Sequence, residues 1–163
     1  MKLKAIILAT GLINCIAFSA QAVDTTITVT GNVLQRTCNV PGNVDVPLGN
    51  LYVSDFPNAG SGSPWVNFDF ALTGCQNMNT VRATFSGTAD GQGYYANTGN
   101  AGGIKIEIQD RDGSNASYDN GAFKTINVQN NSATFNLKAR AVSKGQVTPG
   151  NISSVITVTY TYA

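Results

Sequence analysis

The sequence predicts an all-β domain in which two antiparallel sheets pack face to face. Apolar and polar residues alternate with a period of two along many short segments, which is the spacing of a half-buried strand. No segment sustains the spacing of an amphipathic helix. Gly, Asn, Asp and Pro separate most of the alternating segments, as turns separate strands. Many short strands with one apolar face each predict a sandwich of two sheets.

Residues 1–22 have the composition of a secretory signal peptide. Two lysines precede an apolar run over residues 5–18, and a small-x-small sequence ends at Ala22. The run is shorter than the roughly 20 residues of a membrane-spanning helix, which argues against a retained anchor. We therefore expect cleavage after Ala22, leaving residues 23–163 as one exported domain.

The mature chain carries few charges and no histidine. Ten Lys and Arg, less Lys2 and Lys4 of the signal peptide, leave eight against nine Asp and Glu, a net charge of −1. A nucleic-acid partner would call for a strong basic excess, so none is expected. Without histidine, Ser-His-Asp and Cys-His catalysis and histidine-based metal sites are excluded. We expect no enzymatic activity, no metal and no cofactor.

Two cysteines remain once Cys15 leaves with the signal peptide. Cys38 and Cys75 are an even pair in an exported chain, which predicts one disulfide bond. The alternative is a reactive or metal-binding thiol pair. It lacks both a Cys-x-x-Cys spacing and a histidine, so we favour the disulfide.

The strands are expected at the alternating segments between the turn-forming clusters. The stretch over residues 86–103 is rich in glycine and predicts a loop that contains Tyr94 and Tyr95. In chain order, the predicted strands cover residues 44–48, 66–72, 81–85, 104–108, 135–141 and 156–162.

A further amphipathic segment, residues 23–34, precedes the domain at residues 35–163. On the pattern alone it is either the first strand of the sandwich or a strand inserted into another subunit. In the second case main-chain hydrogen bonds supply affinity and one row of side chains fills pockets. Gly31 suits a place where two backbones approach closely. The row consists of Val23, Thr25, Ile27, Val29, Gly31 and Val33.

The last predicted strand carries an apolar row that runs to the penultimate residue. A strand of this kind at a chain end leaves a sheet edge open to pairing. The alternative is an ordinary last strand that is paired at both edges. The row consists of Ile156, Val158, Tyr160 and Tyr162.

This C-terminal pattern resembles that of the pilins of the chaperone–usher pathway. Their motif combines a penultimate Tyr, alternating apolar residues before it, and a Gly near the fourteenth place from the end. Tyr162, the row before it and Gly150 occupy those places. The resemblance covers the whole chain and is nearest to the minor subunits of type 1 and S fimbriae. It implies an incomplete immunoglobulin-like β-sandwich that lacks its last strand and has an N-terminal donor strand.

The resemblance also implies how such subunits join. A periplasmic chaperone fills the gap left by the missing strand, and at the outer-membrane usher the N-terminal extension of another subunit replaces it. Residues 23–34 would be this donor strand, and Gly150 and the C-terminal apolar row would contact the chaperone or the neighbouring subunit. Head-to-tail contacts of this kind propagate as an open filament outside the cell. Thr25 departs from the pattern, because a larger residue is expected in that row.

The likeness to S-fimbrial minor subunits further implies cell adhesion, with sialic-acid glycans as a hypothesis. It directs attention to Lys138 and Arg140, which lie two residues apart on one outward strand face. A guanidinium can hold a carboxylate through two parallel hydrogen bonds, and an ammonium adds charge. Lys144 would contribute from the following loop. The alternative for these cations is an ordinary solvated strand face.

Aromatic residues offer a second set of sugar contacts. Trp65, Tyr94 and Tyr95 would stack on a sugar ring, or they pack in the core and loops.

Two other functions of the whole chain also stay open on the sequence. One is a purely structural adaptor without a glycan site, and the other is a free-standing secreted immunoglobulin-like domain.

Overall fold

The structure, a computed structural model, describes residues 25–33 and 37–163. It comprises two units, residues 1–33 and 34–163. In the first unit, the described residues form no strand and all are exposed. The predicted signal peptide and Val23 lie outside the described residues. No helix in the described ranges has the length and apolar character needed to span a bilayer.

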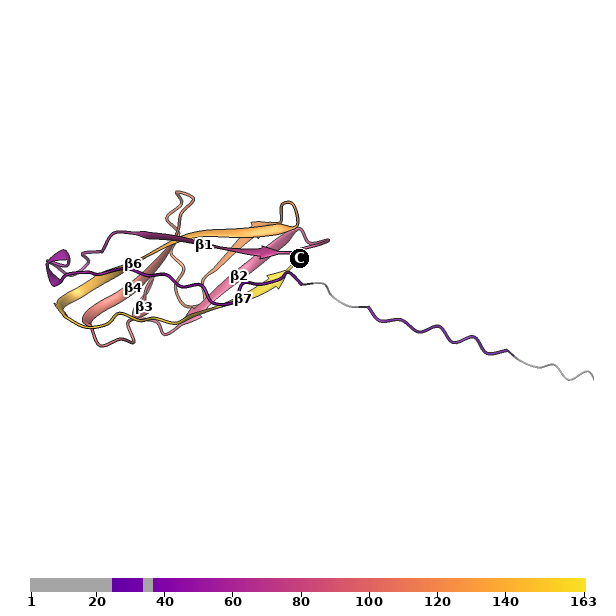
Figure 1. The fold of residues 1–163 in the computed structure, drawn as a ribbon, viewed down its shortest axis with the longest axis horizontal. Helices are drawn as coiled ribbons and strands as arrows, with labels where there is room; N and C mark the ends of the chain where they lie inside the picture. Colours follow the sequence, from indigo (N-terminus) through magenta and orange to yellow (C-terminus); the bar gives the residue numbers. More distant parts are fainter. Residues whose placement is uncertain (1–24, 34–36) are drawn as a thin grey trace, which may run out of the picture. The chain divides into compact units, whose positions relative to one another are not determined.

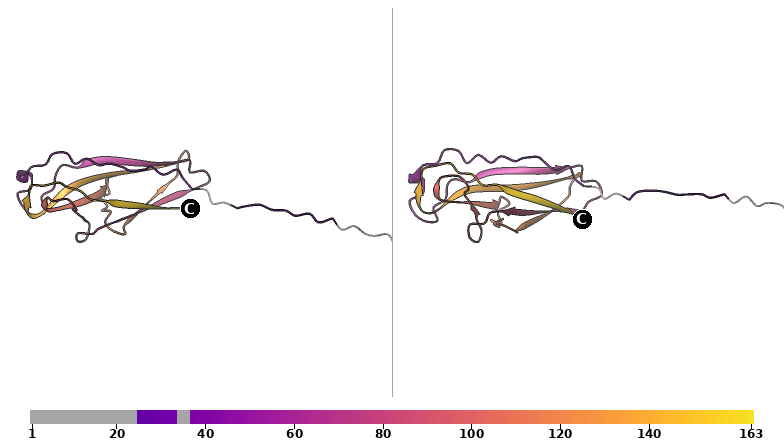
Figure 2. Two further views of the ribbon diagram at one scale, coloured as in Figure 1. Left: turned by 60° about the horizontal axis from the view of Figure 1, so that its bottom comes forward. Right: turned by 90° about the horizontal axis from the view of Figure 1, so that it is seen from below.

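The second unit is an all-β sandwich of two antiparallel sheets, as the alternation predicts (Figures 1 and 2). One sheet has the strand order β1-β6-β4-β3 and the other has the order β5-β2-β7. The elements are η1 (Val53–Asp55, a 3-10 turn), β1 (Val66–Thr73), β2 (Thr80–Gly87), β3 (Tyr95–Ala96), β4 (Gly102–Asp110), β5 (Phe123–Asn127), β6 (Ser132–Thr148) and β7 (Ile156–Tyr162).

Five of the predicted strands are confirmed as β1, β2, β4, β6 and β7. Their apolar rows face inward because each row lies on one side of a pleated strand. The buried members include Phe70 and Leu72 of β1, Val81 and Phe85 of β2, Ile104, Ile106 and Ile108 of β4, and Phe135 and Leu137 of β6.

The predicted strand at residues 44–48 is wrong, because the structure has no strand between Asn39 and Val53. Val46 and Leu48 nevertheless pack against the core and are partly buried. Pro47 has no backbone N–H to donate to a ladder. The segment therefore has the side-chain alternation of a strand without the hydrogen-bonded neighbour that would make it one.

The strands of the structure differ from the predicted strands in three further respects. β5 was missed because its inward positions are Lys124 and Ile126, so its alternation is half polar. β3 lies inside the predicted loop and places the buried Tyr95 opposite Ile106. β6 extends to Thr148, past the predicted end, because a register shift opposite Gly102–Ile104 lets its pairing with β4 continue.

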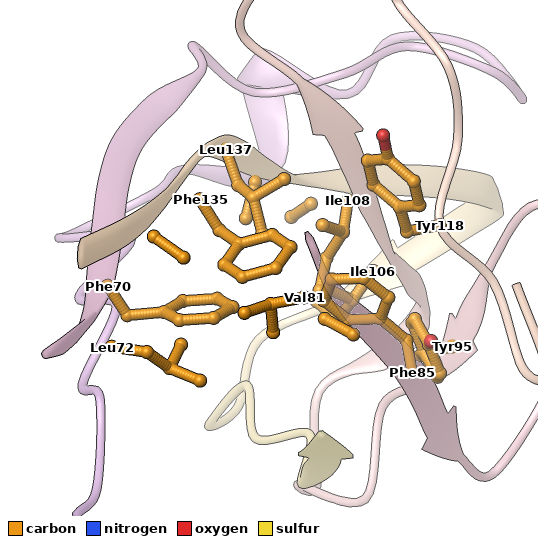
Figure 3. Packing of buried hydrophobic residues seen from close by; sticks show 14 of the residues in the cluster. Phe70, Leu72, Val81, Phe85, Tyr95, Ile106, Ile108, Tyr118, Phe135 and Leu137 are labelled. Atoms are coloured by element: carbon orange, nitrogen blue, oxygen red, sulfur yellow. The ribbon is translucent and has the colours of Figure 1, made fainter. Parts of the chain in front are cut away.

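The core lies between the two sheets and is rich in aromatic rings (Figure 3). Phe70 and Phe135 stack with centroids 5.0 Å apart, and Phe85 stacks on Tyr118 at the same distance. Offset ring pairs of this kind add to the free energy gained by burial. The core therefore fixes β1, β2 and β6 against one another and leaves β7 at one margin.

Candidate functional site

The C-terminal strand lies at the edge of its sheet. In the described residues β7 pairs with β2 alone, from Ile156 opposite Gly87 to Tyr162 opposite Val81. An edge strand presents a row of backbone N–H and C=O groups that another strand can pair with. In the described residues, β7 therefore has the open edge that the sequence predicts and is not paired on both sides.

The inward row of β7 is only partly covered. Ile156, Val158, Tyr160 and Tyr162 are partly buried, although each packs against the core. Tyr160 lies 6.2 Å from Phe70 and 6.4 Å from Phe135 between ring centroids. Loss of hydration raises the pKa of the Tyr160 hydroxyl, with a smaller effect of Tyr162. The row thus belongs to the core and still offers apolar surface to a further strand.

A pocket of about 350 Å³ lies where the chain enters β7. We call it the terminal pocket. Its walls are mainly apolar and come from three separate stretches of the chain, within residues 51–56, 101–104 and 147–152. They include Leu51, Tyr52, Val53, Phe56, Ile104, Val147, Gly150 and Ile152.

Gly150 lines this pocket and also touches the backbone before β4. A Cβ placed there would lie 2.4 Å from the Ala101 nitrogen, closer than real contacts allow. A larger residue would push residues 100–101 away from the turn that leads into β7. The structure thus supplies a packing reason for glycine here, beside its predicted contact with a partner.

The described part of the predicted donor strand has an apolar row with no cover. Ile27 is 83% exposed and Val29 is 90% exposed. Thr25, Gly31 and Val33 are exposed as well. None of residues 25–33 belongs to either sheet. Within its own unit this segment is an uncovered amphipathic stretch.

The predicted disulfide between Cys38 and Cys75 is confirmed, with both residues buried and their Cα atoms 4.4 Å apart. Next to it, Asn39 and Thr73 exchange backbone hydrogen bonds of 2.7 and 3.0 Å. The bridge therefore ties the start of the second unit to the end of β1.

The two predicted cations on β6 share one aromatic neighbour. Lys138 and Arg140 alternate with buried residues, so both project from the outer face, as expected. The Lys138 Nζ lies 4.8 Å from the centre of the Trp65 ring, and the Arg140 Cζ lies 4.3 Å from it. Cations attract the face of an indole ring. Trp65 thus gathers both positive side chains at one place on the sheet.

Each of these cations also has a polar partner. Arg140 donates from Nε to the Glu107 Oε2 at 2.7 Å, and Lys138 donates to the Asn115 Oδ1 at 2.6 Å. Glu107 is 5% exposed and lies directly opposite Arg140 on β4. Its other oxygen accepts a hydrogen bond of 2.7 Å from the Gln109 amide. A charge pair this well bonded holds Arg140 in one orientation.

Lys144 differs from the prediction in two ways. It lies within β6 rather than in a loop, because that strand continues to Thr148. Its Nζ pairs with the Asp90 Oδ2 at 2.7 Å, so Lys144 does not join Lys138 and Arg140 at the Trp65 ring. Of the other aromatic candidates, Tyr95 is fully buried and cannot reach a sugar, while Tyr94 lies beneath the Lys105 ammonium.

Sequence reasoning missed Glu107, Gln109 and Asn115 as neighbours of the cations. Glu107 appears in the sequence as a polar position of a strand, which predicts exposure. Its role depends on the register that sets it across from Arg140. Knowledge of that register would have identified it.

Comparisons with known proteins agree with this description. Residues 27–163 match a protein family described as Fimbrial protein. The chain is 95% identical over 163 residues to the S-fimbrial adhesin protein SfaS of Escherichia coli O6:K15:H31, covering 100% of both chains. It is 43% identical over 148 residues to the protein FimG of Escherichia coli K12, covering 88% of this chain and 87% of FimG.

A solved structure of a chaperone–usher pilus has the same fold. It superposes with a TM-score of 0.66 at 20% sequence identity, over 90% of this chain and 100% of that one. At this identity the likeness bears on architecture. The sandwich is thus of the immunoglobulin-like type found in pilus subunits.

Proposed function

The chain belongs to the fimbrial protein family, and on that premise we propose that it is a minor subunit joined to its neighbours by donor-strand exchange. Its place is outside the cell, in the fimbria. Residues 23–34 would be the strand lent to the next subunit, and the edge of β7 would accept a strand in turn. During export, the chaperone and then the usher would act on the same edge.

The observation that carries this proposal is the edge of β7, which has no strand neighbour among the described residues and lies beside a partly covered apolar row. A strand added there would satisfy backbone groups and bury the row, with one side chain at the terminal pocket. The uncovered row of residues 25–33 is the complementary part on each subunit. A free-standing secreted domain has no need of either feature.

Deletion of residues 23–33 tests donor-strand exchange. The deleted chain should remain folded, because neither sheet includes residues 25–33. It should no longer lend a strand, so immunoblots of sheared fimbriae should show the neighbour that normally receives it missing. Loss of the circular dichroism spectrum of a folded domain would instead make the segment part of its own fold and contradict the proposal.

We further propose that the outer face near Trp65 binds sialic-acid glycans through Lys138 and Arg140; Lys144, which pairs with Asp90, lies outside this group. Support comes from the convergence of two cations on one indole and from the similarity to a protein named as an S-fimbrial adhesin. Single-site binding of this kind is weak, and several copies would have to engage together for firm adhesion. A purely structural adaptor is the alternative function.

Haemagglutination that is lost on sialidase treatment tests the glycan site. Lys138→Ala and Arg140→Ala should abolish it while subunit incorporation stays normal. Lys105→Ala is the matched control, because Lys105 lies on the adjacent strand and contacts Tyr94 instead. Unchanged agglutination by the Lys138 and Arg140 variants would remove the glycan site and leave the structural role intact.

A further inference from the structure

Arg140 is held by three neighbours that leave one edge of its guanidinium open. We propose that Glu107, Trp65 and Gly62 are positioning residues that aim this open edge at a ligand carboxylate. We call Glu107, Trp65 and Gly62 the arginine clamp. The inference rests on the proposed glycan function, and it adds Glu107 and Gly62, to which neither that proposal nor the comparisons assign a role.

The Glu107 contact uses only part of the guanidinium. Glu107 accepts from Nε at 2.7 Å, while its second oxygen is occupied by Gln109. The Nη1 and Nη2 atoms of Arg140 have no hydrogen-bond partner among the described residues. Those two nitrogens form the end of the planar fork, which can donate two parallel hydrogen bonds to a carboxylate.

Burial of Glu107 makes this arrangement stiff. Its side chain is 7% exposed, whereas that of Arg140 is 28% exposed. The carboxylate is anchored on β4, and its Arg140 partner stands opposite it on β6. A guanidinium fixed at Nε leaves its Nη1 and Nη2 atoms without a hydrogen-bond partner among the described residues. A ligand therefore meets an oriented donor pair and does not have to order a free side chain.

Gly62 provides the room in which the guanidinium lies. A Cβ at this position would be 2.7 Å from the Arg140 Nη1 and 2.9 Å from its Cζ. Gly62 pairs with Val142, so its backbone continues the ladder beside β6. The Trp65 ring lies against the same guanidinium. An added methyl group would displace a flexible side-chain end and not the backbone.

Gly62→Ala is therefore the sharpest test of the arginine clamp. The domain should fold and enter fimbriae normally, because only the end of Arg140 has to move. Binding of those fimbriae to a polymer carrying sialyllactose should fall roughly ten-fold or more, the effect of losing a charge-assisted hydrogen-bonded pair. Gly42→Ala is the matched control, since nothing lies within 4 Å of a Cβ there. A polymer carrying lactose, which lacks the sialic acid, is the control for the ligand.

Glu107 is tested by a pair of variants. Glu107→Ala removes the acceptor of the Nε hydrogen bond and should weaken sialyllactose binding by a similar factor. Glu107→Gln keeps an oxygen acceptor at that place and should recover part of the loss. In the chain purified from the periplasm, nuclear magnetic resonance should show faster water exchange of the Arg140 Nε–H in the alanine variant than in the wild type.

The outcomes separate the two proposals. If wild-type fimbriae do not distinguish sialyllactose from lactose, the glycan function fails and the arginine clamp fails with it as a ligand-positioning device. If Arg140→Ala loses binding while Gly62→Ala and Glu107→Ala bind like the wild type, the glycan function stands and the arginine clamp is overturned. Unchanged Nε–H exchange in Glu107→Ala would also overturn it.

Discussion

At the scale of single residues, Asp110 on β4 joins the two sheets. It is buried and accepts hydrogen bonds from the Tyr118 hydroxyl and from the Lys124 ammonium. Lys124 belongs to β5, in the opposite sheet. This pair explains why β5 tolerates a lysine at an inward position, since a buried ammonium needs a charged partner.

Asp110→Ala should lower the free energy of unfolding by about 3–5 kcal/mol, because it leaves Lys124 partly buried without its main partner. Urea denaturation measures the loss. Asp112→Ala is the control and should cost much less, since Asp112 lies 3.6 Å from the Lys124 Nζ with a side chain that is 55% exposed. Equal losses in both variants would contradict the assignment.

Buried tyrosines predict a loss of stability at alkaline pH. Burial, with a smaller effect of Asp119, raises the pKa of Tyr95 to about 12, and burial together with Asp110 raises the pKa of Tyr118 still further. The unfolded chain ionises these phenols near pH 10. Their contribution is therefore complete below about pH 10 and is lost as the pH rises through the folded-state pKa values.

The measurement is the free energy of unfolding at a series of pH values from 8 to about 12. It should stay level up to about pH 10 and then decline, and Tyr118→Phe should make the decline shallower. Tyr52→Phe is a suitable control because the Tyr52 side chain lies largely at the surface. A decline that begins below pH 9 would point to other groups.

At the scale of elements, the two faces of the predicted donor strand differ in polarity, so substitutions on them should have different effects on assembly. Ile27 lies in the apolar row and Thr28 lies on the polar side. Ile27→Asp would bring a carboxylate into an apolar groove of the neighbour, which costs several kcal/mol unless the charge is neutralised. Thr28→Asp would place the same group toward solvent.

We therefore expect Ile27→Asp to abolish joining to the neighbour and Thr28→Asp to preserve it. The yield of joined subunits in sheared fimbriae, resolved by gel electrophoresis without boiling, measures the difference. Equal incorporation of both variants would show that the alternation of residues 23–34 does not govern assembly.

At the scale of the whole molecule, the disulfide bond anchors a segment of the sandwich that has no strand partner. Residues 40–52 contain no strand, so Cys38 and the neighbouring Asn39–Thr73 bridge anchor one end of this segment. Removal of the disulfide bond raises the conformational entropy of the denatured chain, and residues 40–52 lose one fixed end in the folded state. The chain-entropy account places the effect at roughly 3–4 kcal/mol.

The double variant Cys38→Ala/Cys75→Ala should thus unfold at clearly lower urea concentration than the wild type. Wild-type protein treated with reductant is the control, and it should behave like the variant. A difference of less than about 1 kcal/mol between variant and wild type would mean that core packing alone holds the segment.

The sequence by itself determined the strands whose faces differ in polarity. The row from Val66 to Leu72 and the row from Ile156 to Tyr162 follow from local alternation, because a pleated strand turns successive side chains to opposite faces. The pair Cys38 and Cys75 followed from counting cysteines in an exported chain. These features depend on neighbours in the chain or on composition, which a sequence displays directly.

Only the tertiary structure decided which segments pair and what surrounds Arg140. Residues 44–48 alternate like a strand yet have no partner, and Lys124 points inward because Asp110 meets it from another sheet. Glu107 faces Arg140 through the register of β4 with β6. Pairing and register are set by contacts between residues far apart in the chain, and local periodicity carries no information about such contacts.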